Sequence, residues 1–392
     1  MRNNRKLKHL KERHKNTLSK IIEYLSGKPI SRISNDMFII LEDALAEYYY
    51  TDSLLPNIVH NSVEKAKKIS KKKSGFINAV LRKLPQDKQL EKIIKNISSD
   101  KDISLILSFP EWIIKEAKKS FTDYIKILEN LNRNAPITLR INPIRKNEVF
   151  KELKENNIPF KSGNLPYSIF ILSSKKLTEL SSWKNGHIYY QDEASQLTGE
   201  ILREYSGKTV LDLCASPGGK STYIAMLDKN ISITSSDLSE RLYLIKENIK
   251  RMGLSNINIV KHSEITGIFH TVLIDAPCSS LGTIRRHPEI KWNKRLKDLD
   301  KYSSIQLSLL EKAYNHTAEG GTIIYSVCTF TQKETKEVCE KFIKSHKDII
   351  EEKIHKNICS TEFDFPGLVK PGTLDMDGFF ISVFRKSKNS LS

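Results

Sequence analysis

Several common features are missing from this chain of 392 residues. Its five cysteines are widely spaced and include no CxxC pair, which argues against a disulfide framework, a zinc ribbon or any other metal site. There is no run of eighteen apolar residues, and no apolar segment follows the basic start. Neither a membrane span nor a secretory signal is therefore expected. These absences predict a cytoplasmic protein without a membrane partner.

Acidic residues are scarce relative to basic ones. The chain has 64 Lys and Arg against 46 Asp and Glu, a formal net charge of +18. This favours a polyanionic partner, either nucleic acid or an acidic membrane surface, over a generally solvated basic surface. The excess is concentrated near the N-terminus, because residues 1–20 and 64–83 each hold eight basic residues and one acid. That distribution favours RNA or DNA.

The apolar pattern changes along the chain. Residues 17–84 repeat apolar side chains at three and four positions, which predicts a small helical bundle within residues 1–85. Residues 86–133 remain helical in pattern but are more charged, as expected of a connection between domains. Residues 134–190 mix strand alternation with one helix and predict a small α+β subdomain. From Thr209 onward, strands and helices alternate, which predicts a doubly wound, Rossmann-like α/β domain over residues 191–387.

A glycine-containing turn at 212–220, DLCASPGGK, joins a buried strand to a helix. Glycine lets the backbone approach a ligand closely, and the helix that follows presents free amides. The turn lacks GxGxxG and a full GK[ST] context, which disfavours a dinucleotide or a nucleoside triphosphate. Asp237 ends the next strand and is suited either to bind ribose hydroxyls or to cap a helix. Its spacing leaves both roles open.

Two cysteines follow apolar, β-branched runs. Cys278 comes after VLIDAP and Cys328 after IIYSV, so both thiols are expected at the ligand-binding edge of a parallel sheet. For a single cysteine, the alternative of a small buried hydrophobe is the stronger interpretation. Asp275 lies three residues before Cys278. The charge and stacking surface that a nucleotide needs follow close behind, in Arg285, Arg286, His287, Lys291 and Trp292.

Pyrimidine chemistry gives a reason for two thiols. Cytosine C5 is too weakly nucleophilic to take a methyl group, but addition of a thiolate at C6 converts the ring to an enamine. A covalent intermediate thus divides one difficult step into easier ones. The proton on C5 must then leave before the thiol is expelled, which gives the second cysteine a function. The residues predict an enzyme that attacks a pyrimidine with one cysteine and methylates it.

At these motifs the sequence resembles the RNA 5-methylcytosine methyltransferases, and among them the bacterial ribosomal family called RsmB, Sun or Fmu. The resemblance also covers two N-terminal segments, YTDSLLPNIVHNSVEKAKK and GFINAVLRKL, which are similar to an all-α NusB-type RNA-binding domain. Two further segments, YYQDEASQL and DGFFISVFRK, are similar to catalytic motifs of the family. The resemblance implies a NusB-like bundle, a small α+β subdomain and a Rossmann-like catalytic domain. It also implies S-adenosylmethionine as methyl donor, small-subunit (16S) ribosomal RNA as partner, and a monomer.

The resemblance also implies the roles of individual residues. Cys328 matches the nucleophile that adds to C6, Cys278 matches the cysteine that assists release, and Asp275 matches the aspartate that hydrogen-bonds the cytosine near the cofactor. The family has an aspartate after the third strand for the adenine, and that contact is assigned to Glu264 in this chain. The remaining S-adenosylmethionine contacts are Cys214, Ala215, Ser216, Pro217, Gly218, Gly219, Lys220 and Asp237.

Two other functions are compatible with parts of the pattern. One is a transfer RNA cytosine-C5 methyltransferase with the same chemistry. The other is a non-catalytic RNA-binding assembly factor in which the basic bundle is the functional part. The joint presence of Cys278, Cys328 and Asp275 argues against the second, because a binding protein has no use for them.

Overall fold

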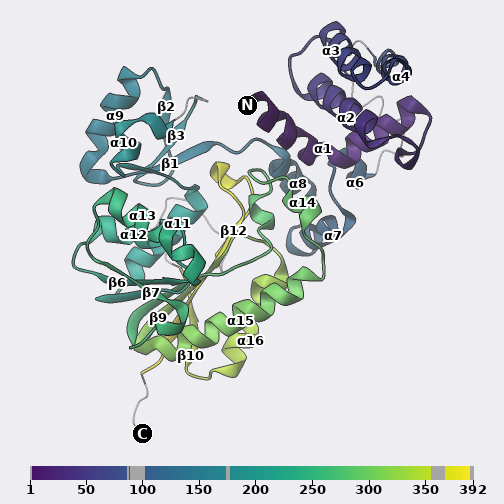
Figure 1. Ribbon diagram of the computed structural model, residues 1–392. Coiled ribbons are helices and arrows are strands. Elements are labelled where there is room, and N and C mark those ends of the chain that lie inside the picture. The colour runs from purple at the N-terminus through teal and green to yellow at the C-terminus, as the bar shows by residue number, and fades with distance from the viewer. Residues whose placement is uncertain (1, 86–87, 89–101, 174–176, 355–366, 389–392) are drawn as a thin grey trace. The chain divides into compact units, whose positions relative to one another are not determined.

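The computed structural model describes residues 2–85, 88, 102–173, 177–354 and 367–388. The chain forms two compact units (Figure 1). The first comprises Met1–Asn132 together with the short segment His287–Arg295, and the second comprises Arg133–Arg286 and Leu296–Ser392. Among the described residues, no helix is long and apolar enough to cross a membrane.

The first unit is helical. Apolar residues at helical spacing, such as Leu18, Ile21 and Leu25, are buried in one core shared by its first four helices. The helical region begins earlier than residue 17, since α1 already starts at Arg2 and is kinked at His14. Its helices are α1 (Arg2–Ser26), α2 (Asn35–Tyr50), α3 (Leu55–Lys67), α4 (Lys71–Leu81), α6 (Ile103–Ile106), α7 (Glu111–Ser120), α8 (Tyr124–Asn132) and α14 (Ile290–Asn293).

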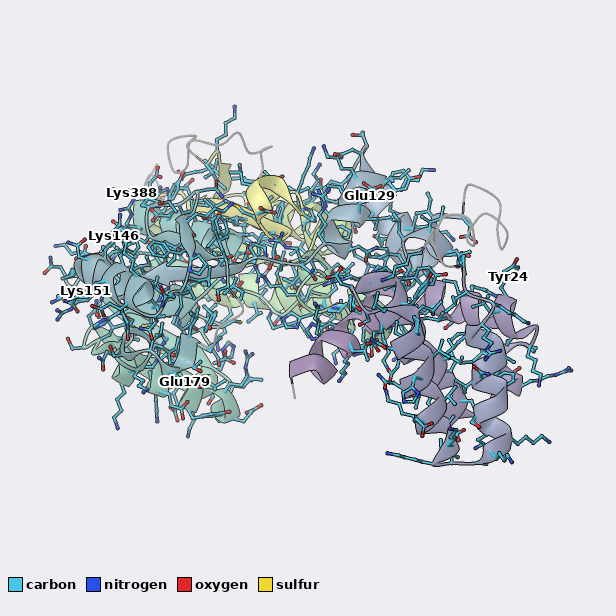
Figure 2. The ribbon with its side chains drawn as sticks, turned by 90° about the horizontal axis from the view of Figure 1, so that it is seen from above. Tyr24, Glu129, Lys146, Lys151, Glu179 and Lys388 are labelled. Carbon is cyan, nitrogen blue, oxygen red and sulfur yellow. The ribbon has the colours of Figure 1, made fainter. Side chains whose placement is uncertain are left out.

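The second unit begins with a small antiparallel sheet in the order β2-β3-β1-β4. Leu139 and Ile169 pair across this sheet and are buried with Val149 and Leu153 of the helix that packs on it. Lys146 and Lys151 of that helix point away from the core (Figure 2). The elements are β1 (Ile137–Ile141), α9 (Lys146–Glu155), β2 (Phe160–Ser162), β3 (Ser168–Ile171), α10 (Ser181–Lys184) and β4 (Ile188–Tyr190).

The larger sheet of the second unit has the order β10-β12-β9-β8-β5-β6-β7. From β9 to β7, each strand in this order is parallel to the next, as the alternation of strands and helices predicts. Its elements are α11 (Glu193–Tyr205), β5 (Thr209–Asp212), α12 (Gly219–Leu227), β6 (Ser232–Asp237), α13 (Leu242–Met252), β7 (Ile257–Lys261), β8 (Phe269–Asp275), α15 (Asp298–His316), β9 (Thr317–Val327), α16 (Lys336–Ser345), β10 (Ile349–Glu352), β11 (Leu368–Val369) and β12 (Phe379–Lys386).

One edge of this sheet departs from a purely parallel pattern. β12 lies antiparallel to β9, with Ile381 opposite Ser326, and β10 lies antiparallel to β12. β12 is buried on both faces over most of its length, which explains its nearly continuous apolar sequence FFISVF. The strand therefore lies directly beside β9, the strand that Cys328 follows.

Candidate active site

Two thiols meet at the carboxyl edge of the sheet. Cys328 directly follows β9, and Cys278 lies three residues beyond the end of β8. Because β8 and β9 are parallel neighbours, their loops leave from the same edge, and the two Sγ atoms lie 3.3 Å apart. The amide of Gly282 donates to the carbonyl oxygen of Cys328 at 3.0 Å. The loops that carry the thiols are thus joined directly to each other.

The short distance between the sulfurs makes the two thiols chemically unequal. A hydrogen bond from Cys278 lowers the pKa of Cys328, although burial acts in the opposite direction. The same hydrogen bond, together with burial, raises the pKa of Cys278 well above its ordinary value. Cys328 is therefore the thiol that ionises first, and Cys278 is the neutral donor that stabilises it. Thiolates, rather than thiols, act as nucleophiles.

The loop of Cys278 is held by a buried carboxylate that sequence reasoning missed. Glu334, fully buried, accepts hydrogen bonds from the amide of Ser279 at 2.7 Å and from its hydroxyl at 2.5 Å. It also accepts from Thr331 Oγ1 at 2.9 Å and from Gln306 Nε2 at 3.3 Å. With Thr329 Oγ1 at 3.4 Å, five donors from three segments converge on one side chain. That arrangement fixes the residue next to Cys278.

Lys220 and Asp275 form an ion pair beside the thiols. The Lys220 ammonium lies 2.5 Å from Asp275 Oδ2, and Ser326 Oγ donates to Asp275 Oδ1 at 3.1 Å. Lys220 is nearly buried, whereas the Asp275 side chain is 36% exposed. Asp275 is therefore held from one side while its carboxylate keeps an open face toward the cavity.

A cavity of about 250 Å³ lies next to this ion pair. It is bordered by the turn between β5 and α12 and by the residues that follow β4. Asp275 ends β8 and also lines the cavity, so the cavity adjoins the edge of the sheet that carries the thiols. The residues that line it are Tyr189, Tyr190, Gln191, Asp192, Ser195, Asp212, Cys214, Ala215, Ser216, Pro217, Gly219, Lys220 and Asp275.

The turn beneath the cavity requires glycine. Gly218 has φ of 96°, in the left-handed region, and its amide donates to the carbonyl of Ala215. From the small sheet, the buried guanidinium of Arg140 donates to the carbonyl of Gly219, to Gln191 Oε1 at 2.9 Å and to Thr222 Oγ1 at 2.8 Å. The small subdomain therefore supports the start of α12 directly.

Asp212 supplies an unused acceptor to the cavity. It is buried, and its Oδ2 accepts from Ser221 Oγ at 2.6 Å. Its Oδ1 has no hydrogen-bond partner among the described residues. Burial raises the pKa of this carboxyl group to about 7. A buried acceptor without a partner is costly, so Asp212 suits a cavity whose ligand brings a donor or a positive charge.

Comparison with known proteins identifies the family. Residues 5–86 match the NusB family, residues 109–178 match an RsmF/B-like ferredoxin-like domain, and residues 200–385 match the family described as 16S rRNA methyltransferase RsmB/F. The chain is 32% identical to the probable ribosomal RNA small subunit methyltransferase B of Bacillus subtilis, over 84% of this chain and 77% of that protein. The chain belongs to this methyltransferase family. A Coxiella burnetii relative with the same description is 28% identical, with 94% of this chain and 89% of the relative covered.

Solved structures agree with the fold. A methyltransferase homologue from Pyrococcus horikoshii superposes with a TM-score of 0.62 at 24% identity, covering 73% of this chain and 98% of that one. NSun6 from the same organism, solved with SFG, gives a TM-score of 0.63 at 20% identity, covering 72% and 99%. The predicted family, the NusB-like and Rossmann-like fold class and S-adenosylmethionine as cofactor of this methyltransferase are confirmed.

Asp237 of this RNA methyltransferase supports the turn between β5 and α12. It is buried, and its Oδ2 accepts from the amide of Ser216 at 2.8 Å while Oδ1 accepts from the amide of Leu238 at 2.8 Å. Arg241 lies 3.6 Å from the same Oδ1. The carboxylate thus holds both the turn and its own loop. Its predicted contact with ribose remains a prediction.

Glu264 lies at the protein surface, three residues after the end of β7. Its side chain is 53% exposed, pairs with Lys261 Nζ at 3.1 Å and accepts from the Lys261 amide at 3.3 Å. It is not among the residues that line the cavity. Glu264 is the first acid after β7 in the sequence. Its contacts with Lys261 account for its position. The structure therefore gives no support to an adenine contact by Glu264.

The basic residues after Cys278 have a different role from the predicted one. Arg285 and Arg286 form buried ion pairs with Asp192 and Asp377. The interpretation of these arginines as nucleotide contacts is therefore corrected, because their charges are already neutralised inside the fold. Asp192 and Asp377 belong to YYQDEASQL and DGFFISVFRK, so the acidic partners of both arginines lie in two of the family motifs.

Lys291 and Trp292 likewise do not offer a nucleotide surface. The Lys291 ammonium is buried within the first unit, donating to the carbonyls of Arg13 and Ser108 at 2.9 and 3.0 Å and to Asn132 Oδ1 at 2.6 Å. Trp292 Nε1 donates to the carbonyl of Glu12 at 2.6 Å. Both side chains anchor the segment His287–Arg295 among helices of the first unit. A count of nearby charges could not reveal these partners.

Proposed function

We propose that this RNA methyltransferase modifies C5 of a cytosine in small-subunit ribosomal RNA through a covalent adduct between Cys328 and C6. The observation that carries the proposal is the 3.3 Å separation of the Cys278 and Cys328 sulfurs at the edge of the sheet. Family membership supports ribosomal RNA as the substrate. A methyl transfer to an oxygen or to an exocyclic nitrogen would have no use for two adjacent thiols.

Cys328 acts first. Its thiolate, stabilised by the hydrogen bond from Cys278, attacks C6 of the ring. The S–C6 bond forms, and the electron pair of the C5–C6 double bond becomes available at C5. When bound, S-adenosylmethionine supplies the methyl group that C5 takes up. Asp275, whose side chain is 36% exposed, would accept a hydrogen bond from the exocyclic amino group and orient the ring.

Cys278 acts in the second half. While Cys328 is anionic, its charge contributes to the raised pKa of Cys278. Once the sulfur of Cys328 is bonded to C6, it is neutral, and that contribution disappears. The pKa of Cys278 then falls at the stage where a base is needed. Cys278 then gives its own proton to solvent, and its thiolate takes the proton from C5. The C5–C6 double bond forms again and the S–C6 bond breaks, which returns Cys328 as a thiolate. The order of events thus follows from the proximity of the two sulfurs.

The cavity residues fit the cofactor by charge. S-adenosylmethionine carries an ammonium, a sulfonium and a carboxylate. Of the three carboxylates that line the cavity, Asp192 and Asp275 are already paired with Arg286 and Lys220, which leaves Asp212 for the ligand. Asp212 Oδ1, which lacks a partner among the described residues, would accept a hydrogen bond from the ammonium group. The turn of Pro217 to Gly219 would contact the cofactor through its backbone, and Asp237 would bind the ribose.

The experiment that tests the proposal separates the thiols. Incubated with substrate RNA and S-adenosylmethionine, Cys278→Ser is expected to give a protein–RNA band that resists denaturant, because methylation proceeds and release does not. Cys328→Ser is expected to give neither a band nor product. Cys339→Ser is the matched control, since Cys339 is a buried free cysteine in α16. It should behave as the unaltered protein.

Two results would contradict the proposal. A band from Cys328→Ser that is absent from Cys278→Ser would reverse the roles of the thiols. Full activity in both variants would return both cysteines to the role of buried apolar side chains. Bisulfite mapping of ribosomal and transfer RNA from cells with and without the protein identifies the RNA. Modification of transfer RNA alone would refute the ribosomal substrate while leaving the chemistry intact.

A further inference from the structure

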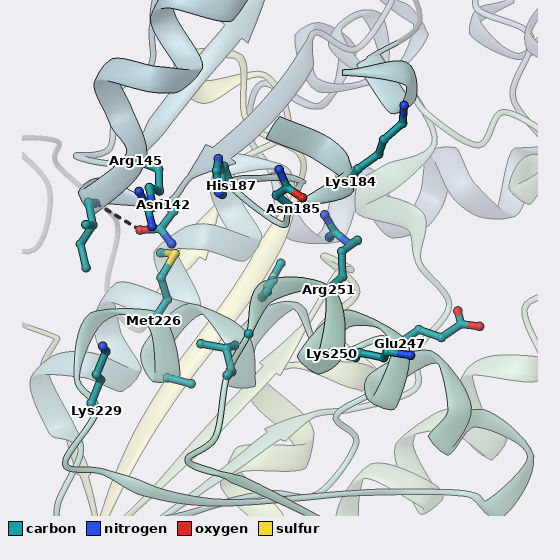
Figure 3. A pocket seen from close by; sticks show the side chains of 15 residues that line it. Asn142, Arg145, Lys184, Asn185, His187, Met226, Lys229, Glu247, Lys250 and Arg251 are labelled. Atoms are coloured by element: carbon teal, nitrogen blue, oxygen red, sulfur yellow. Dashed lines mark hydrogen bonds between the residues drawn. The ribbon is translucent and has the colours of Figure 1, made fainter. Parts of the chain in front are cut away.

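A second, larger groove lies in the unit that carries the catalytic edge. Its volume is about 800 Å³. One side is formed by the small subdomain, from the residues after β1 and from α10, and the other by the C-terminal ends of α12 and α13 (Figure 3). These segments are distant in the sequence. The basic residues that line the groove are Arg145, Lys184, His187, Lys229, Lys250 and Arg251.

The groove is strongly unbalanced in charge. Against these basic residues, Glu247 is the one acid that lines it among the described residues. Lys184, Lys229 and Lys250 are exposed, and none of the three forms an ion pair within the part of the chain that the structure describes. Three such lysines give this groove a positive potential that attracts anions.

Most cations that line the groove also have a contact or a position of their own within the fold. Arg251 donates to the carbonyls of Trp183 and Ile188 and lies 4.3 Å from the centre of the Trp183 ring. Arg145 pairs with Glu148 at 2.8 Å. Lys184 and Lys250 lie in the last turns of α10 and α13, where a positive charge complements the helix dipole. Neither position neutralises the ammonium group, which stays exposed.

We infer that this groove binds phosphate groups of the substrate RNA outside the target nucleotide. The inference rests on the proposed RNA substrate. Three lysines on separate segments suit successive phosphates of a strand, because each is a flexible point charge. A single small anion would instead need a cage of buried donors, whereas these three side chains are exposed. The net charge of +18 agrees with a polyanionic ligand.

The test replaces the three lysines together. The variant Lys184→Gln, Lys229→Gln, Lys250→Gln is compared with Lys341→Gln, Lys344→Gln, Lys347→Gln, which removes the same charge from exposed lysines of α16 and the residues after it. Fluorescence anisotropy with a labelled 16S ribosomal RNA fragment is measured across a salt series. The groove variant should lower the log–log salt slope by roughly 0.7 to 0.9 for each phosphate that the protein no longer neutralises. The control variant should keep the slope of the unaltered protein.

Equal slopes for the groove variant and the control variant would overturn the inference. Calorimetry with S-adenosylmethionine reports whether each variant is folded, and single replacements serve if the triple variant is not. The assay measures RNA binding alone. If the groove does not bind RNA, the proposed cysteine chemistry is therefore unaffected. Absence of a trapped adduct in Cys278→Ser would refute the proposed function, but it would not change the salt slopes.

Discussion

The catalytic cavity and the basic groove both lie in the second unit, and both assemble side chains from distant segments. Charged side chains are paired around the cavity, whereas three lysines of the groove form no ion pair among the described residues. Around the cavity, Lys220 pairs with Asp275, and Arg285 and Arg286 pair with Asp192 and Asp377. In the groove, Lys184, Lys229 and Lys250 are left exposed. Chemistry that depends on position uses buried, paired charges, whereas attraction of a polyanion needs charges that remain available to solvent.

The largest effect is expected from breaking a buried pair at the cavity. Asp377→Ala leaves Arg285, which is 2% exposed at its side chain, without its main partner. Removing one member of a buried ion pair costs about 3–5 kcal/mol, so urea unfolding should show a much lower midpoint. Glu264→Ala, which removes an exposed acid, should leave the midpoint unchanged. Equal midpoints would mean that the pairing around the cavity contributes no stability.

A smaller effect is expected from Asp237→Ala on the cofactor. Loss of a hydrogen bond to a charged acceptor costs about 1.5–3 kcal/mol, which corresponds to roughly a 10- to 150-fold weaker affinity. Calorimetry with S-adenosylmethionine measures it, and urea unfolding shows how much of the effect comes from the turn that Asp237 supports. An unchanged affinity would remove Asp237 from the site. Glu264→Ala is expected to bind the cofactor normally.

The hydrogen bond between the thiols predicts a shift in pH dependence. Cys278 lowers the pKa of Cys328 by donating this hydrogen bond, so Cys278→Ala should raise that pKa and move the alkylation profile of Cys328 to higher pH. Iodoacetamide labelling, followed at the peptide containing residue 328, measures the shift. Cys339→Ala should leave the profile in place. A profile that does not move would show that the two sulfurs are not hydrogen-bonded in solution.

The smallest effect is expected in the N-terminal basic segment, where half of the six lysines are already paired. Lys65, Lys67 and Lys73 are engaged in ion pairs with Asp43, Glu64 and Asp36. Lys68, Lys71 and Lys72 are exposed and form no ion pair among the described residues. Replacing these three by Gln should reduce the RNA salt slope by at most roughly 0.7 to 0.9 for each lysine that binds a phosphate. No change in slope, measured beside the groove variant, would assign RNA binding to the second unit.

Prediction from sequence worked best where local pattern and chemistry coincide. The apolar runs before Cys278 and Cys328 and the alternation of strands with helices place both thiols at one edge, since parallel neighbours end together. Prediction from sequence failed where the partner of a side chain lies far away along the chain. Arg285 and Lys291 look like nucleotide contacts in a linear segment, and only the folded chain brings Asp377 to one and the carbonyls of the first unit to the other.

By itself, the sequence determined the order of elements, the glycine turn and the type of chemistry, because these depend on residue types and short spacings. Tertiary structure alone decided that the two sulfurs lie 3.3 Å apart, that Glu334 holds the residue beside Cys278, and that Lys184, Lys229 and Lys250 line one groove. The reason is physical. Hydrogen bonds, burial and charge pairing depend on distances of a few ångströms between residues far apart in the chain, and spacing along the sequence carries no record of those distances.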